Sequence, residues 1–228
     1  MDARERLFLV EAQRYHASGG DLDALVDVYC VGATVSITDL PHYGCTRLYH
    51  AAQEGWCSAL KVLLDQGADV HVGYAGTKRS TPLHTAARYD RLDAAVLLLD
   101  AGARVDHRDH GGLTPLHIAG RTDMCQLLLS RGAPLDARST PLDAVGISGR
   151  DPEAYARSLG HTTAADFLAA VRAAGGWRAY CDAQRRKFLD LRRELLAPGA
   201  VAESSIRLYE RVFVELPNAV FPRVLAFF

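Results

Sequence analysis

The stretch "STPLHTAARYDRLDAAVLLLDAGARV", from Ser80 to Val105, decides the fold, because nearly the same arrangement occurs twice more. It returns as "LTPLHIAGRTDMCQLLLSRGAPL" from Leu113 to Leu135, and more loosely as "TRLYHAAQEGWCSALKVLLDQGADV" from Thr46 to Val70. The threonines of the three copies are 35 and 33 residues apart, and every copy ends in a Gly-Ala pair. Self-similarity at such a period indicates a chain built from stacked structural repeats.

Each copy carries the signals of two helices joined by a turn. Thr81 and Thr114 are suited to cap a helix through their hydroxyls, and the prolines after them suit the first helical position. A leucine-rich run follows, and the glycine of Gly-Ala is typical of a helix C-cap. The third copy reaches its Gly-Ala after 18 residues instead of 21, so it has lost about one helical turn. The polar segments between copies predict protruding, hairpin-like loops.

Further copies are expected on both sides of these three. Residues 19–35, "GGDLDALVDVYCVGATV", are interpreted as an earlier, degenerate copy that keeps the Gly-Ala ending. A fourth copy is predicted to start at "STPLDAV", residues 139–145. After it we expect an insertion with a short helix over residues 152–158, and then a helix over residues 162–174. One helix pair cannot bury its apolar face alone, whereas stacked pairs can, and the result is an all-α solenoid with a concave side.

The signature hexapeptides resemble a known family. "TPLHTA", residues 81–86, and "TPLHIA", residues 114–119, match the T-P-L-H-x-A signature of the ankyrin repeat. "TRLYHA", residues 46–51, departs at two positions. The resemblance covers about residues 20–172 and implies an ankyrin solenoid of about four to five repeats. It also implies that His84 and His117 tie adjacent layers together through hydrogen bonds to loop backbone.

The resemblance divides the chain into three parts. We expect residues 1–18 to form an N-terminal capping helix that packs through Leu7, Val10, Ala12 and Tyr15. Residues 19–174 are predicted to form the ankyrin repeats, the first and last of them divergent. Residues 175–228 are predicted to form a C-terminal helical extension, which begins with an amphipathic helix whose polar face is rich in arginine.

The last 13 residues, "LPNAVFPRVLAFF", resemble the first helix of an F-box, a module that docks on an adaptor of a ubiquitin ligase. Ala219 stands where an acidic residue is usual, and Pro222 lies inside the proposed helix. The segment either packs back on the C-terminal helix, docks on such an adaptor, mediates dimerisation or binds another partner. The candidate docking positions are Leu216, Pro217, Val220, Phe221, Val224, Leu225 and Phe228.

Charge, hydropathy and cysteine spacing argue against several classes of protein. A net charge of −1 argues against a globally basic nucleic-acid binder. No apolar run approaches the roughly 18 residues that cross a bilayer, and the run at residues 7–10 is too short for a secretory signal. The five cysteines are scattered without C-x-x-C spacing, which favours an intracellular protein, cytoplasmic or nuclear.

The chain carries no recognisable catalytic motif. It lacks the phosphate-binding loop, H-E-x-x-H and G-x-S-x-G. His107, Asp109 and His110 are close together, but without a partner cluster they are interpreted as a polar loop tip and not as a metal site. We therefore expect no enzyme activity, no cofactor and no metal.

The resemblance also implies where a partner binds. Ankyrin stacks bind proteins through the loop tips and the exposed side of the first helix of each repeat. Carried over by position, these residues are rich in Tyr, Arg and His, and Tyr and Arg dominate binding hot spots. We therefore expect a protein partner that presents an acidic or phosphorylated peptide. The candidate partner-binding residues are Tyr43, Gln53, Glu54, Tyr74, Lys78, Arg79, Arg88, Tyr89, His107, Arg108, His110 and Arg121.

Overall fold

The computed structural model describes residues 3–17, 26–27, 44–72, 79–140 and 149–195. The chain divides into two compact units, Met1–Ala165 and Asp166–Phe228.

The first unit holds the repeats as successive helix pairs. They are preceded by α1 (Ala3–Ala17) and by a two-residue antiparallel ladder of β1 (Val26–Asp27) and β2 (Gly44–Cys45), in which Val26 pairs with Cys45. The pairs are α2 (Arg47–Glu54) with α3 (Cys57–Asp65), α4 (Pro82–Arg88) with α5 (Leu92–Asp100), and α6 (Pro115–Ile118) with α7 (Thr122–Ser130). They are followed by α8 (Pro152–Ser158) and by α9 (Thr162–Ala173), which begins in this unit and ends in the second one.

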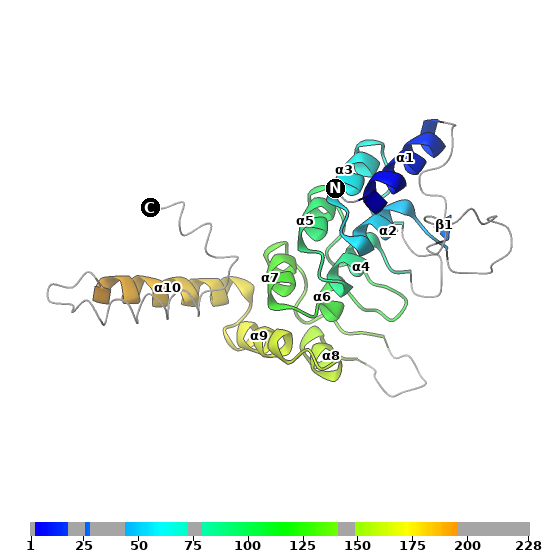
Figure 1. The fold of residues 1–228 in the computed structure, drawn as a ribbon. Helices are drawn as coiled ribbons and strands as arrows, with labels where there is room; N and C mark the ends of the chain where they lie inside the picture. The colour runs from blue at the N-terminus through cyan, green and yellow to red at the C-terminus, as the bar shows by residue number, and fades with distance from the viewer. Residues whose placement is uncertain (1–2, 18–25, 28–43, 73–78, 141–148, 196–228) are drawn as a thin grey trace. The chain divides into compact units, whose positions relative to one another are not determined.

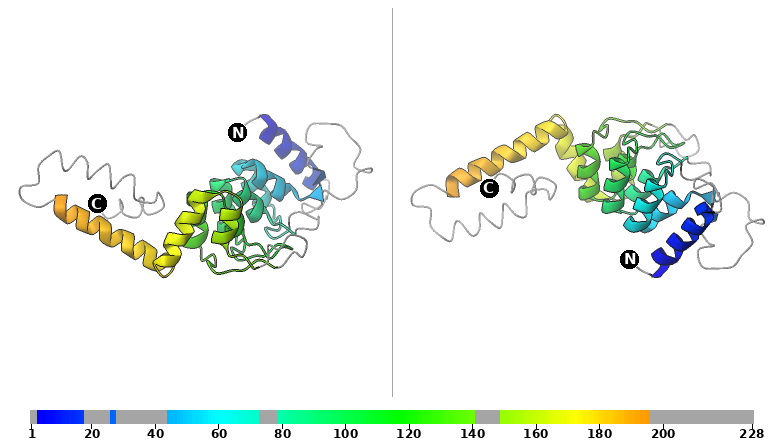
Figure 2. Two further views of the ribbon diagram at one scale, coloured as in Figure 1. Left: turned by 90° about the horizontal axis from the view of Figure 1, so that it is seen from below. Right: turned by 90° about the horizontal axis from the view of Figure 1, so that it is seen from above.

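The helices of the first unit stack in two rows. The first row is α2, α4, α6 and α8, each in contact with the next, and the second row is α3, α5 and α7. Figure 2 shows from two further sides that the repeats follow one another in chain order, from the blue α1 to the green α7. The leucines of the repeats fill the space between layers: Leu60, Leu83, Leu98, Leu116 and Leu128 are each 0% exposed. Apart from the short β1–β2 ladder, this is the predicted solenoid of stacked helix pairs.

The first-row helices begin as the sequence predicts. Thr81 and His84 form a reciprocal capping box at the start of α4, and Thr114 and His117 form another at the start of α6. In the first repeat Tyr49 replaces the histidine, and the Thr46 hydroxyl accepts the Tyr49 N–H at 3.2 Å. Because the caps recur, each repeat starts its helix with the same orientation.

The second-row helices end at the Gly-Ala pairs. Gly67, Gly102 and Gly132 have φ values of 90°, 92° and 88°, a left-handed conformation that glycine adopts without strain. The alanine after each glycine donates its N–H back to the helix, for example from Ala103 to the Leu98 carbonyl at 2.9 Å. The motif therefore reverses the chain at the same point in each layer.

The turn missing from the third repeat is lost from its first helix. α6 has four residues where α4 has seven, whereas α3, α5 and α7 have nine each. The shortened copy predicted from residue spacing is thus confirmed, and the shortening falls on the first row.

The short helix predicted over residues 152–158 is confirmed as α8, which follows α6 in the first row. Of the segment 139–145, predicted to start the fourth copy, only Ser139 and Thr140 are among the described residues. α8 begins at the N-cap Asp151, whose side chain accepts the Ala154 N–H at 2.9 Å, and Pro152 takes the first helical position. Ser139 instead belongs to the base of the preceding loop, where its N–H donates to the Arg150 carbonyl at 3.0 Å. Asp151-Pro152 therefore starts this helix as Thr-Pro starts α4 and α6, because aspartate is as good an N-cap residue as threonine.

The predicted packing face of α1 is also wrong where it can be checked. Leu7 and Val10 are 47% and 53% exposed, whereas Glu5, Phe8 and Leu9 are buried. The side chains of Ala12 and Tyr15 lie outside those that the structure describes. Four consecutive apolar residues, 7–10, surround the helix, so the sequence pattern did not select the buried face.

The second unit contains the end of α9 and α10 (Trp177–Leu195). Phe167, Trp177 and Tyr180 form an aromatic cluster, in which the rings of Trp177 and Tyr180 are stacked with centroids 6.0 Å apart. The arginines and lysine of α10 at positions 178 and 185–187 are exposed. The F-box-like segment, residues 216–228, lies outside the described residues.

Candidate partner-binding surface

The loop before α6 is organised by the carboxylate of Asp109. Its Oδ1 accepts the N–H groups of Gly111 and Leu113, both at 2.9 Å, and so fixes the turn that leads into Thr114. Gly112 has a φ of 67°, and an added Cβ would lie 2.5 Å from the Thr140 nitrogen of the next loop. The loops are therefore packed against one another, which holds their exposed side chains in place.

The signature histidines connect this loop region to the helices. The Thr81 N–H donates to His84 Nδ1 at 3.3 Å, so the proton is on Nε2, which donates to the Leu113 carbonyl at 3.1 Å. His117 repeats the pattern one layer on, with Nε2 3.2 Å from the Arg150 carbonyl. Burial lowers the pKa of His84 to about 4 and also lowers the pKa of His117. Both imidazoles are neutral ties between layers, as the family resemblance implies.

His107, a candidate contact residue, is part of a row of imidazoles. Its ring stacks on His71 with centroids 6.5 Å apart, and meets His84 edge-on at 5.8 Å. Burial is the main cause that lowers the pKa of His107, and the neighbouring His71 adds to it. His107 is half-buried, so only part of its ring faces outward.

Three exposed candidates lie close in sequence to these loops and helix starts: Arg79, Arg108 and His110. Arg79 has a left-handed backbone with φ 44°, a conformation uncommon outside glycine. The Arg108 guanidinium donates to the carbonyls of Gly112 and Arg138, so it bridges two successive loops. Its charge is met by neutral carbonyl oxygens and remains available to a partner.

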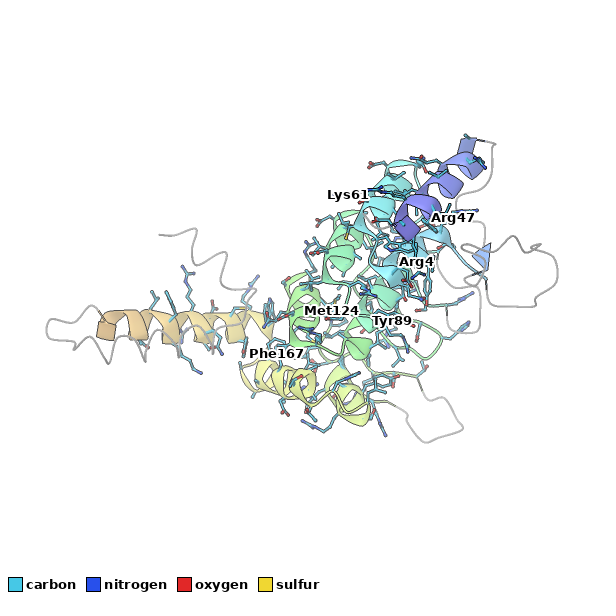
Figure 3. The ribbon with its side chains drawn as sticks, viewed as in Figure 1. Arg4, Arg47, Lys61, Tyr89, Met124 and Phe167 are labelled. Atoms are coloured by element: carbon cyan, nitrogen blue, oxygen red, sulfur yellow. The ribbon has the colours of Figure 1, made fainter. Side chains whose placement is uncertain are left out.

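The other candidates lie at the opposite end of the first-row helices. Arg88 and Tyr89 are exposed at the end of α4, and Tyr89 is labelled on the stack in Figure 3. Gln53 and Glu54 end α2, where Glu54 lies 3.9 Å from Arg4, while Arg121 pairs with Asp90 at 3.0 Å. The structure thus divides the candidates into two groups, separated by the seven residues of α4, about 10 Å.

A set of interlayer contacts was missed by the sequence reasoning. The residue directly before each second helix is Trp56, Arg91, Arg121 or His161. Arg91 donates to the Gln53 carbonyl of the preceding repeat at 3.0 Å, Arg121 pairs with Asp90 of the repeat before it, and the His161 ring lies over Gly120. These residues occupy the same position in each copy, and that shared position could have revealed the contacts. The residue type differs from copy to copy, so the sequence pattern did not show them.

Several predicted site residues lie outside the described residues. These are Tyr43, Tyr74 and Lys78 of the loops and the whole segment 216–228.

The part of the chain that the structure describes holds few side chains suited to reactive chemistry. There, no group of three or more His, Cys, Asp or Glu side chains is placed to hold a metal ion. Burial raises the pKa of the Cys125 thiol to about 12, which makes it a poor nucleophile. Also within those parts, every helix is too short or too polar to cross a membrane.

The repeats are similar to those of known proteins. The chain is 49% identical over 88 residues to human neurogenic locus notch homolog protein 4, which covers 35% of this chain and 4% of that protein. It is 41% identical over 98 residues to the Drosophila melanogaster neurogenic locus Notch protein, covering 40% of this chain and 4% of that one. It is 34% identical over 103 residues to human transient receptor potential cation channel subfamily A member 1, covering 42% of this chain and 9% of that protein. The chain thus spans less than a tenth of the length of these relatives.

A family-level comparison reaches further along the chain. The model of ankyrin repeats, three copies long, matches residues 14–109 and 48–139, which together are more than half of the sequence. With the equivalent caps, the left-handed glycines and the two rows of helices, this match shows that the chain belongs to the ankyrin repeat family.

Proposed function

We propose that this chain binds a partner protein through the loops and first-row helices of its repeats. Ankyrin repeats are protein–protein interaction modules, and the family is generally non-enzymatic. Fold alone does not name a partner, so the proposal depends on the side chains that the frame exposes. The observation that carries it is the exposure of Arg79, Arg88, Tyr89 and His110 on layers whose backbones are rigidly tied together.

The partner that fits this surface presents an acidic segment. Among the described residues, neither Arg79 nor Arg88 forms an ion pair, and Arg108 is bonded to carbonyls. By contrast, Asp90 and Asp106 are paired with arginines, and Asp109 is bonded to loop N–H groups. A partner carboxylate or phosphate therefore meets unneutralised guanidinium groups, and Tyr89 adds a rigid aromatic contact.

The test is charge reversal in the full chain. The partner is first recovered by affinity purification from the cells that make the protein, and its affinity is then measured by calorimetry. We expect Arg79→Glu with Arg88→Glu to weaken binding at least tenfold, since two attractive contacts become repulsive. The matched control is Arg185→Glu with Arg186→Glu on α10, which changes the net charge equally and leaves binding unchanged. Equal affinities for the two double variants would reject this surface.

The alternative function is that of a substrate receptor for a ubiquitin ligase, docked on its adaptor through Leu216–Phe228. Only the sequence of that segment supports it. A pull-down of the adaptor with the full chain and with a variant carrying Leu225→Asp and Phe228→Asp tests it. Equal recovery from both chains speaks against docking.

A further inference from the structure

The N-terminal end of the stack is completed by a carboxylate from far away in the sequence. Glu5 of α1 is 6% exposed, and its Oε1 accepts the N–H groups of Ser58 at 3.1 Å and Ala59 at 3.2 Å. These are the second and third residues of α3, whose own N-cap, Trp56, makes no side-chain capping bond. Glu5 therefore caps α3 from another helix, a role normally filled by the N-cap residue itself.

The next two repeats show what the first one lacks. The second residue of the second-row helix is Asp93 in α5 and Asp123 in α7, whereas it is Ser58 in α3. An acidic residue in the first turn is favourable because it faces the positive end of the helix dipole. α3 has none in its first turn, and Glu5 supplies the missing carboxylate.

Beside this cap lies an aromatic surface that α1 also covers. The Phe8 ring contacts His50 and Trp56, with centroids 5.7 Å and 5.3 Å apart, and the Arg4 guanidinium lies 5.7 Å from the Trp56 ring. Figure 3 labels Arg4 where α1 meets the first repeat. His50 is 3% exposed, and within the described structure neither of its ring nitrogens has a hydrogen-bond partner. The end of the stack thus combines two N–H donors, an unpaired imidazole and an indole.

α1 is held there by one narrow stripe. Its buried described side chains, Glu5, Phe8 and Leu9, are spaced i, i+3 and i+4, while Leu7 and Val10 are about half exposed. In addition, 29 residues separate the end of α1 from the start of α2, so no short linker ties this helix to the first repeat in the sequence.

We propose that this end of the stack is a helix-docking site that recognises the pattern Glu-x-x-Phe-Leu, that α1 is its resident ligand, and that α1 of a second copy of the chain can take its place. The carboxylate fits the α3 N–H groups, and the phenyl ring fits between His50 and Trp56. The site does not include Arg79, Arg88, Tyr89 or His110, which carry the proposed partner surface, so either assignment can fail without the other.

The test uses the full chain with Phe8→Ala, which loosens its own α1. A fluorescent peptide of residues 3–17 stands for the α1 of a second copy, and its binding is followed by anisotropy. We expect saturable binding at least tenfold tighter than to the unaltered chain, whose site is filled. A peptide with Glu5→Gln should bind at least tenfold more weakly, whereas one with Arg6→Gln, altered at an exposed position, should bind like the original.

Two binding results would overturn the proposal, and so would one folding result. The binding results are equal affinity of the peptide for the altered and unaltered chains, and undiminished affinity of the Glu5→Gln peptide. If circular dichroism shows that the Phe8→Ala chain is unfolded, the milder Glu5→Gln chain takes its place in the titration. Unfolding of both chains would show that α1 is an indispensable part of the fold and not a replaceable ligand.

Discussion

The fifth residue of the T-P-L-H-x-A signature shows how one position is used differently in each layer. It is His50 in the first repeat, Thr85 in the second and Ile118 in the third, and all three are buried. The Thr85 hydroxyl has no hydrogen-bond partner within the described structure. A buried hydroxyl without a partner destabilises the fold, because it loses its bonds to water on folding.

We therefore expect Thr85→Val to stabilise the chain. Valine keeps the shape of threonine and removes the unpaired hydroxyl, and Ile118 shows that the equivalent site accepts a β-branched apolar residue. The gain should be about 1 kcal/mol in the free energy of unfolding, measured by urea denaturation monitored by circular dichroism. Thr163→Val on the exposed surface of α9 is the control and should change little. A destabilised Thr85→Val chain would mean that the hydroxyl is satisfied.

At the scale of the helix, the Thr-His capping box sets the start of each first-row helix. Thr81→Ala removes the hydroxyl that lies 2.8 Å from His84 Nδ1, and with it the cap of α4. We expect the free energy of unfolding to fall by about 1 to 2 kcal/mol, again by urea denaturation. Thr81→Ser keeps the hydroxyl and should recover most of the loss. Equal losses for alanine and serine would assign the effect to the methyl group and not to the cap.

Elements whose determinants are local in sequence were predictable. Residue spacing predicted the capping threonines, the glycines that end the second-row helices and the shortened third copy. The structure has all three at the predicted positions. The next helix of the first row, α8, starts at Asp151-Pro152, which does not match the Thr-Pro of the signature. In such a case a capping residue of another type carries the same function, and the motif alone misleads.

Elements whose partners lie far away in sequence were not predictable. Glu5 meets Ser58 across 53 residues, and Arg91 meets Gln53 across 38. No spacing rule connects these pairs, because the stacking of layers and not the local helix brings them together. The candidate contact residues were located by analogy with the repeat frame, so their positions followed from the sequence but their ion pairs did not.

At the scale of the repeat stack, neighbouring layers are coupled by buried neutral histidines. Burial lowers the pKa values of His84 and His117, which make these interlayer bonds, from their usual 6.5, to about 4 for His84. It also lowers the pKa of the buried His50, whose ring nitrogens have no hydrogen-bond partner within the described structure. The unfolded chain therefore binds more protons than the folded one between these values. Above pH 6.5 these histidines are neutral in both states, so their titration does not change the free energy of unfolding. As the pH falls from about 6.5 toward the lowered pKa values, the free energy of unfolding decreases.

For the whole protein we therefore expect acid sensitivity that originates in these interlayer ties. The loss from His84 alone between pH 7 and pH 4 is on the order of 3 kcal/mol, because its Nδ1 must stay unprotonated to accept the Thr81 N–H. Urea denaturation at a series of pH values measures this directly. His84→Gln, which cannot take up a proton, should flatten the dependence between pH 6.5 and pH 4, whereas the exposed His110→Gln should keep the slope of the unaltered chain. If the His84→Gln chain shows the same slope as the His110→Gln chain, protonation of the layer ties is not what limits the stack in acid.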